Sequence, residues 1–233
     1  MLHSLADGYR AIVIGASGGV GGALMALLEA DACCAFALPL SRSKDDLDIT
    51  DEASVAAAAS RLGDQRGSFD LIFNATGALT IDGVGPEKSI KAIDPLQMAK
   101  QFAVNAIGPA LLLKHFAPLL KREEKCVFAS LSARVGSIGD NRLGGWISYR
   151  ASKAAQNQII RTAAIEIGRT NPRSIVVALH PGTVANDLSQ PFSTGKDRFE
   201  PEESAARLLQ TIDALTPEQT GQFFAYDGSR IEW

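Results

Sequence analysis

The chain has 233 residues, of which 46% are hydrophobic and 21% are charged, a composition typical of one well-packed globular domain. Its net charge is −3 and its basic residues are scattered, so the sequence predicts no nucleic-acid-binding face and favours a small-molecule partner. Three cysteines provide neither a disulfide framework nor the ligand spacing of a metal site. The first ten residues lack a secretory-signal pattern and no apolar run approaches the roughly 20 residues of a membrane span, so we expect a cytoplasmic protein without a membrane partner.

Short apolar runs alternate with longer helical patterns along the chain, which is typical of a parallel sheet covered by helices. Repeats and linkers are absent from the sequence, so we expect one domain over residues 1–233. The predicted fold is α/β, a single doubly wound, Rossmann-like parallel sheet with helices on both faces. The predicted strands lie at 11–15, 34–40, 69–76, 125–132, 174–182 and 221–228, and the predicted helices at 20–30, 52–62, 95–120, 148–169 and 201–215.

The first predicted strand runs directly into a glycine-rich turn and then into a helix. Gly15, Gly19 and Gly21 occupy this turn with the spacing G-x-x-x-G-x-G. Glycine permits a tight turn and a close approach of the backbone to a pyrophosphate, whose charge a helix N-terminus stabilises. Such a turn can also bind nothing, but the strand before it and the helix after it favour a dinucleotide site.

The second predicted strand ends without an acidic residue. A dinucleotide site that prefers NAD carries an acid there to bind the ribose hydroxyls, whereas this chain has Ser41-Arg42-Ser43-Lys44. Arg42 could bind a 2′-phosphate, so the sequence favours NADP and leaves NAD open; a solvated basic turn is the alternative. Only residues 41–46 separate this strand from LDIT, which is too few for a normal crossover, so we expect the helix there to be missing or reduced to a turn.

Tyr149 and Lys153 lie four positions apart near the start of a predicted helix, and therefore on one face of it. A nearby ammonium stabilises a tyrosinate and lowers the pKa of the phenol, so Tyr149 could exchange a proton near neutral pH. Ser132 ends a strand at the sheet edge where open α/β sheets bind ligands, and its hydroxyl could polarise a substrate oxygen. The segments FNATG and HPGT end two further strands at that edge.

Together these residues resemble the short-chain dehydrogenase/reductase family over essentially the whole chain. The segments SARVGSIGDNRLGGWISYRASKAA and HPGTVANDLSQPF are similar to its C-factor-like branch, whose namesake is associated with cell-to-cell signalling. The matching elements are the glycine motif with Gly15, Ser17, Gly19, Val20 and Gly21; the adenine-contacting pair Asp48 and Ile49; the strand end Asn74, Ala75, Thr76 and Gly77; the helix residue Asn105; Ser132; Tyr149 and Lys153; and Pro181, Gly182, Thr183 and Val184 beside the nicotinamide.

The resemblance implies hydride transfer between a nicotinamide and a small or medium carbonyl or alcohol substrate. It implies that Tyr149 is the general acid and base, and that Lys153 binds the nicotinamide ribose and lowers the phenol pKa. It further implies that Ser132 binds the carbonyl oxygen and that Asn105 positions a water toward Lys153. A nucleotide-sensing or signalling protein that keeps the dinucleotide cleft is the alternative function.

Several features remain open at this level. The loop before Tyr149 is longer than is usual in the family, so Ser130 and Ser137 are lesser candidates for the role of Ser132. Trp146 could line a substrate pocket or anchor its loop, and His180 is more consistent with a packed or hydrogen-bonded residue than with a base.

We expect a substrate lid over residues 185–200. Helix 95–120 is apolar on more than one face, and the resemblance implies pairing through it and helix 148–169, as a homodimer or homotetramer.

Overall fold

The computed structural model describes residues 2–185 and 198–233. Six strands form one parallel sheet in the order β2-β1-β3-β4-β5-β6. Each of the six predicted apolar runs overlaps one of these strands, although β1 begins at Tyr9, before the predicted 11–15, so the predicted α/β fold is confirmed. The strands are β1 (Tyr9–Ile14), β2 (Cys34–Leu40), β3 (Leu71–Asn74), β4 (Cys126–Leu131), β5 (Ser174–His180) and β6 (Phe223–Ala225).

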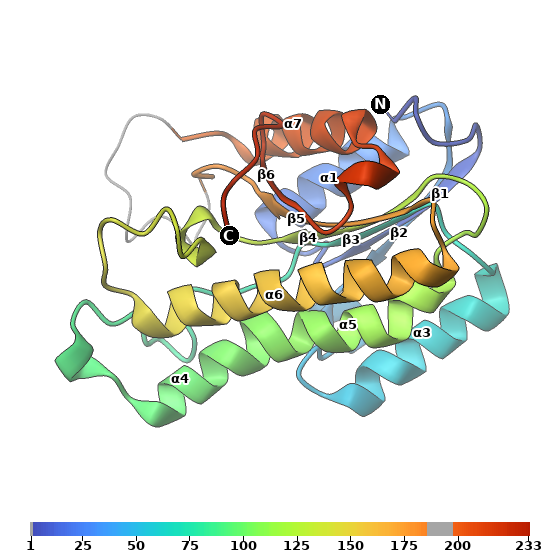
Figure 1. Ribbon diagram of the computed structural model, residues 1–233. Helices are drawn as coiled ribbons and strands as arrows, with labels where there is room; N and C mark the ends of the chain where they lie inside the picture. The colour runs from blue at the N-terminus through green and yellow to red at the C-terminus, as the bar shows by residue number, and fades with distance from the viewer. Residues whose placement is uncertain (1, 186–197) are drawn as a thin grey trace.

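Helices cover both faces of the sheet (Figure 1). On one face lie α1 (Gly19–Glu29) and α7 (Pro201–Ala214), which pack against each other. On the other face lie α3 (Glu52–Arg66), α5 (Gly108–Phe116) and α6 (Ile147–Thr170), with α4 (Pro95–Phe102) extending α5. The remaining helical turns are α2 (Arg42–Asp45) and the 3-10 turns Ile90–Ala92, Ala117–Leu119, Arg134–Gly136 and Pro217–Gln219.

Two hydrophobic cores result from this layering, because successive residues of a strand point to opposite faces of the sheet. In β3, Phe73 lies in the core under α1 and α7, whereas Ile72 lies in the core under α3, α5 and α6. All residues of β3 are buried, as expected for a parallel strand covered on both sides. Asn74, the last residue of β3, therefore faces the same side as Ile72, toward α6.

One edge of the sheet is formed by β2, which is only partly buried. It contains Pro39, a residue that edge strands tolerate because one side of their backbone is unpaired. Between β2 and the segment LDIT the chain forms only the four-residue helix α2, which confirms the predicted reduction of the helix there, whereas the crossover to β3 is made by α3. The chain then passes to β3, on the other side of β1. The carboxyl ends of β1 and β3 therefore flank the point where the strand order reverses, which is where open α/β sheets bind ligands.

Helix α4 continues into α5 through the π-helical segment Ala103–Ile107. The continuous helix, Pro95–Leu119, is long and apolar enough to cross a membrane by length and composition, with 39% of its most apolar window buried. It packs against α6 and α3 within the layered fold (Figure 1). We therefore interpret it as a core helix, a type that meets the same criterion.

Candidate active site

The glycine turn after β1 brings the start of α1 against the strand end. Gly15 has φ +88°, a left-handed conformation that favours glycine. A Cβ on Gly21 would lie 2.2 Å from the Gly15 carbonyl oxygen, so only glycine permits this approach. Among the described residues, no side chain caps α1, which begins at Gly19, so its first N–H groups are available to an anion such as a pyrophosphate. Of the other predicted turn residues, Ser17 is exposed and Val20 is buried.

The end of β2 lies directly beside this turn. The carbonyl of Leu40 accepts hydrogen bonds from the N–H groups of Gly15 and Ala16, at 2.8 and 3.2 Å. Arg42 follows two residues later and its side chain is exposed. Sequence reasoning overlooked Asp45, whose carboxylate reaches back to the strand end and accepts bonds from the Ser41 N–H and hydroxyl, at 2.8 and 3.2 Å.

Asp48 and Ile49, the predicted adenine contacts, follow α2. The Asp48 carboxylate accepts hydrogen bonds from the Thr50 hydroxyl and N–H, at 2.7 and 2.8 Å, and these bonds hold the pKa of Asp48 below its usual range. Ile49 packs on α5, where a Cβ on Gly108 would lie 2.8 Å from Ile49 Cδ1. The Asp48 carboxylate is thus hydrogen-bonded within its own turn, and Ile49 packs this turn against α5.

The end of β3 is organised by the buried amide of Asn74. Its Oδ1 accepts bonds from the Thr76 hydroxyl and N–H, at 2.6 and 3.0 Å, and its Nδ2 donates to Ser130 Oγ at 2.8 Å. The Ala75 N–H continues the ladder to β1 by donating to the Ile14 carbonyl at 2.7 Å. These bonds fix the strand end on the α6 side of the switch point.

Gly77 lies beside the predicted catalytic lysine. Its φ is +150°, and a Cβ there would lie 3.2 Å from both Asn105 Oδ1 and Lys153 Nζ. A side chain at 77 would therefore take the space between these two groups. The structure thus brings Gly77, Asn105 and Lys153 together at one point.

Asn105 lies in the π-helical segment, a distortion often found at functional sites. Its Oδ1 accepts a bond from the Ala78 N–H at 2.9 Å, and its Nδ2 donates to the Ala78 carbonyl and to Gln101 Oε1, at 2.8 and 2.7 Å. Both amide hydrogens are therefore used, one on the turn after β3 and the other on Gln101 of α4. A water directed toward Lys153 would have to use the remaining lone pair or the backbone of Asn105.

Tyr149 and Lys153 lie on the buried face of α6, with 7% and 3% of their surfaces exposed. The ammonium of Lys153 donates to the Leu131 carbonyl at 3.1 Å and to Gln156 Oε1 at 2.8 Å. Burial lowers the pKa of Lys153 to about 7 and raises the pKa of Tyr149 well above its ordinary value. Lowering of the phenol pKa was expected from the ammonium, and burial acts in the opposite direction.

The hydroxyl of Tyr149 makes no hydrogen bond with the part of the chain that the structure describes. Its ring meets the Trp146 ring edge to face, with 6.4 Å between centroids. Trp146 has φ 53° and follows Gly144 and Gly145, which are also left-handed. Trp146 therefore packs beside the phenol, which is compatible with either role that the sequence left open for it.

Ser132 is buried, and its hydroxyl donates to Asn157 Oδ1 at 2.6 Å. The Asn157 Nδ2 donates to the Gly136 carbonyl at 3.4 Å. This bond orients the Asn157 amide so that its Oδ1 is the atom that faces Ser132. The single hydroxyl hydrogen of Ser132 is thus engaged by α6 rather than directed to a substrate. To polarise a carbonyl, Ser132 would first have to release Asn157.

The two lesser serine candidates are also buried. Ser130 Oγ accepts bonds from Asn74 Nδ2 and Gln156 Nε2, at 2.8 and 2.9 Å. Ser137 Oγ accepts a bond from the Asp140 N–H at 3.1 Å. Ser130 therefore belongs to the network between β3 and α6, and Ser137 to the loop that precedes α6.

The end of β5 forms the opposite side of the site. Gly182 has φ +79°, and a Cβ there would lie 2.7 Å from the Phe199 ring and 3.0 Å from the Tyr226 ring. Val184 pairs with Phe199 in an isolated bridge, and the Pro181 carbonyl accepts a bond from Ser204 Oγ at 2.8 Å. Thr183, the last of the four predicted residues, is exposed. The predicted lid over 185–200 falls mostly on residues 186–197, which lie outside the described residues.

His180 ends β5, and burial lowers its pKa to about 4. Its Nδ1 accepts a bond from the Arg134 N–H at 3.4 Å. A histidine that is neutral and hydrogen-bonded to a neighbouring loop fits the packed role that the sequence favours. Among the described residues, no group of three or more histidine, cysteine or acidic side chains could hold a metal ion.

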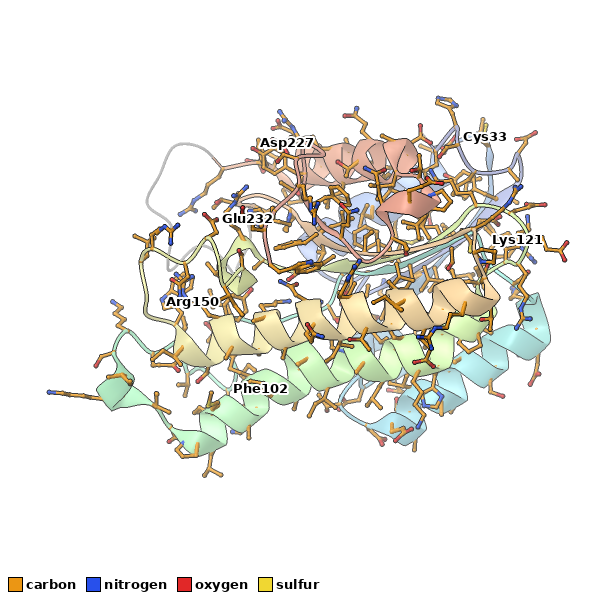
Figure 2. All side chains as sticks on the ribbon, viewed as in Figure 1. Cys33, Phe102, Lys121, Arg150, Asp227 and Glu232 are labelled. Carbon is orange, nitrogen blue, oxygen red and sulfur yellow. The ribbon has the colours of Figure 1, made fainter. Side chains whose placement is uncertain are left out.

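The loop between β4 and α6 forms the outer wall of the site. Arg150 holds it from one side by donating to the Gly145 carbonyl at 3.0 Å. The C-terminal residues hold it from the other, since the Gly139 N–H donates to the Trp233 carbonyl at 3.0 Å. In Figure 2, Arg150 and Glu232 lie toward the same end of the molecule, whereas Cys33 and Lys121 lie toward the opposite end.

Sequence reasoning missed Gln156 and Asn157, which contact Lys153 and Ser132. A signal for them was present, because they lie three and four positions after Lys153 and therefore on the same helix face. Polar residues on the buried face of a core helix require partners, and these two bind the lysine and the serine.

Comparison with known proteins identifies the family of the chain. A family model described as enoyl-(acyl carrier protein) reductase matches residues 30–230. The chain is 35% identical over 187 residues to 1-hydroxy-2-glutathionyl-2-methyl-3-butene dehydrogenase of Rhodococcus sp. (strain AD45), covering 80% of this chain and 78% of that protein. It is 32% identical over 168 residues to C-signal of Myxococcus xanthus, covering 72% of this chain and 94% of that protein.

Among solved structures, the fold is similar to the NADPH-bound carbonyl reductase from chicken fatty liver. The TM-score is 0.84 at 24% identity, with 99% of this chain and 97% of that chain covered. This likeness bears on the fold alone, whereas the family model and the two relatives bear on descent. The chain belongs to the short-chain dehydrogenase/reductase family and is an oxidoreductase that uses a nicotinamide dinucleotide.

Proposed function

We propose that this chain is an NADP-preferring reductase or dehydrogenase that interconverts a small or medium carbonyl compound and its alcohol. The observation that carries the proposal is the burial of Tyr149 and Lys153 on one face of α6, with the amine beside Gly77 at the switch point of the sheet. The dehydrogenase relative supports the substrate class. The exposed Arg42 beside the glycine turn supports NADP.

The residues at the switch point fit a dinucleotide. Gly21 leaves no side chain between α1 and the Gly15 carbonyl, and the first N–H groups of α1 are uncapped by any described side chain. The glycine turn would bind the pyrophosphate, and Arg42 the 2′-phosphate. Asp48 and Ile49 would line the adenine, and the turns Asn74–Gly77 and Pro181–Val184 would flank the nicotinamide half. When bound, the nicotinamide supplies or accepts the hydride.

In this proposal Tyr149 gives its proton to the substrate oxygen during reduction. Because burial raises its pKa, the phenol keeps its proton at neutral pH, which is the form that reduction requires. The Lys153 ammonium uses two of its three hydrogens on Leu131 and Gln156, so one remains for the nicotinamide ribose or the phenol. The oxidative direction needs a tyrosinate, which a charged Lys153 would stabilise.

Replacing Tyr149 by Phe tests the proposal. Because the phenol is the proton donor, the variant should lose at least about 100-fold in kcat for NADPH-dependent carbonyl reduction. NADPH binding, followed by fluorescence titration, should change less than about threefold, since only one of many cofactor contacts is removed. Ser60→Ala, which removes a hydroxyl at an exposed position of α3, is the control and should retain activity.

A second candidate function is suggested by the likeness to C-signal of Myxococcus xanthus. In a signalling or nucleotide-sensing protein the cleft would bind the dinucleotide without requiring the phenol. Cellular function that survives Tyr149→Phe while carbonyl turnover is lost would favour this second function over the first.

We also propose that the chain is one cytoplasmic domain that forms a homodimer or homotetramer. A groove of about 630 Å³ between α5 and α6, lined by apolar residues such as Leu113, Ala117, Ile159 and Ile167, supports pairing through these helices.

A further inference from the structure

A network of hydrogen-bonded, buried polar side chains connects the end of β3 to the Lys153 amine on α6. It links Asn74, Ser130, Gln156 and Lys153, which are between 0% and 3% exposed. Asn74 and Ser130 are register partners in neighbouring strands and face α6. Gln156 lies one turn after Lys153, so its carboxamide reaches both the amine and the strand.

In this network, a second hydrogen bond made by each carboxamide determines which of its atoms donates and which accepts. Asn74 Oδ1 is taken by the Thr76 N–H and hydroxyl, so Nδ2 is the atom that faces Ser130 Oγ, at 2.8 Å. Gln156 Nε2 donates to both Ser130 Oγ and the Leu131 carbonyl, at 2.9 and 3.0 Å. The oxygen of Gln156 must therefore face Lys153, which donates to it at 2.8 Å.

No charged partner for the amine is present among the described residues. From α6 it meets the neutral carboxamide of Gln156, and Tyr149, one turn before Lys153, shares the buried face of that helix. From β4 it meets the Leu131 carbonyl, and Gly77, in the turn after β3, lies beside both the amine and the Asn105 amide of the π-helical segment. A carboxylate at position 156 would hold a lysine permanently charged, whereas a carboxamide orients the amine without adding charge.

We propose that Gln156, braced by Ser130 and Asn74, is a positioning residue that holds the Lys153 amine and aims its remaining hydrogen into the crevice. This inference deepens the proposed function and rests on it for the role of Lys153. Gln156 would act only by positioning the Lys153 amine, and a displacement of a reacting group by about 1 Å can lower the rate by about 100-fold. Gln156→Leu should therefore reduce kcat by about 10- to 100-fold.

A packing role for Gln156 would also reduce activity, so the decisive measurement is the titration of Lys153 in the cofactor-free protein. The ¹³Cε resonance of lysine, assigned with Lys153→Met, reports protonation of the amine directly. Gln156→Leu removes an acceptor from the charged form and should lower the titration midpoint, whereas Gln156→Glu supplies a carboxylate and should raise it by more than one pH unit. The pH profile of kcat should move in the same two directions.

Two further variants complete the experiment. Ser130→Ala removes the brace and should give a smaller loss of kcat than Gln156→Leu, with NADPH affinity nearly unchanged. Gln65→Leu makes the same chemical change at an exposed position of α3 and should behave as wild type. If Gln156→Leu does not fold, Gln156→Glu, which has nearly the same volume and keeps an acceptor, still tests the direction of the shift.

A Lys153 midpoint that stays within about 0.3 pH units of wild type in both Gln156 variants overturns the inference. The failure of the proposed function is distinguishable from this result. A wild-type protein without NADPH-linked turnover would defeat the proposed function, while the lysine titration, which needs neither cofactor nor substrate, would still decide whether Gln156 controls the amine.

Discussion

At the scale of single residues, the proposed preference for NADP over NAD depends on the side chains that directly follow β2. Arg42 is exposed one residue beyond Ser41, while the nearby acid, Asp45, is bound by the Ser41 N–H and hydroxyl. In the proposed function, an acid held in this way would compete less for ribose hydroxyls than a free one, and Arg42 would bind the 2′-phosphate. The preference for NADP, which the basic turn favours in the sequence, stays a prediction.

Arg42→Gln should weaken NADPH binding about tenfold or more and leave NADH binding nearly unchanged, because a charge-assisted bond to phosphate contributes about 1.5–3 kcal/mol. Fluorescence titration of both cofactors measures the ratio. Arg61→Gln, an exposed change on α3, is the control. Tighter binding of NADH than of NADPH by the wild type would contradict the assignment.

At the scale of elements, the start of α6 is stabilised from a distant loop. The Glu87 carboxylate accepts bonds from the Ser148 N–H and hydroxyl, at 2.7 and 2.5 Å, and the Glu87 carbonyl accepts one from the Trp146 N–H at 2.6 Å. A carboxylate at a helix N-terminus satisfies free N–H groups and favours the helix dipole. This contact positions the helix turn that carries Tyr149.

Glu87→Ala should therefore lower the free energy of unfolding by about 1–2 kcal/mol, the usual effect of losing an N-terminal cap, and should also lower kcat because Tyr149 loses its support. Urea denaturation and steady-state kinetics measure the two effects. Glu87→Gln keeps an acceptor and should recover most of the stability, and Lys88→Ala, exposed in the same loop, should be neutral. Equal stability of Glu87→Ala and wild type would show that the contact does not support α6.

At the scale of the whole molecule, acid stability should depend on His180 at the end of β5. Burial lowers its pKa from 6.5 to about 4 in the folded chain. Between these values the unfolded chain binds the proton and the folded chain does not, so the free energy of unfolding rises with pH from about 4 to 6.5 and falls on acidification.

The effect of this single group is at most about 3 kcal/mol. Thermal unfolding measured from pH 4 to 7 should show a smaller dependence on pH in His180→Asn than in wild type. His3→Asn, exposed near the N-terminus, should leave the slope unchanged. A wild-type slope that persists fully in His180→Asn would assign the acid sensitivity to other groups.

Much of the fold could be predicted from the sequence, because its signals are local. The apolar runs predict all six strands, and the alternation with helical patterns predicts a parallel sheet covered on both faces. The shortness of residues 41–46 predicts the reduced helix α2. Likewise, Gly21 could be recognised as a glycine that the turn requires, because strand, turn and helix are contiguous in the chain.

Tertiary structure decided the rest, because it depends on which side chains meet across elements. Periodicity put Tyr149 and Lys153 on one face, but only packing against β4 showed that Lys153 binds the Leu131 carbonyl and that burial, rather than the ammonium, dominates the phenol pKa. The engagement of Ser132 by Asn157 likewise depends on the distance between a strand end and a helix face 25 residues later in the chain. Sequence spacing determines neighbours within one element, whereas the partner of a buried polar group across elements is selected by the packed fold.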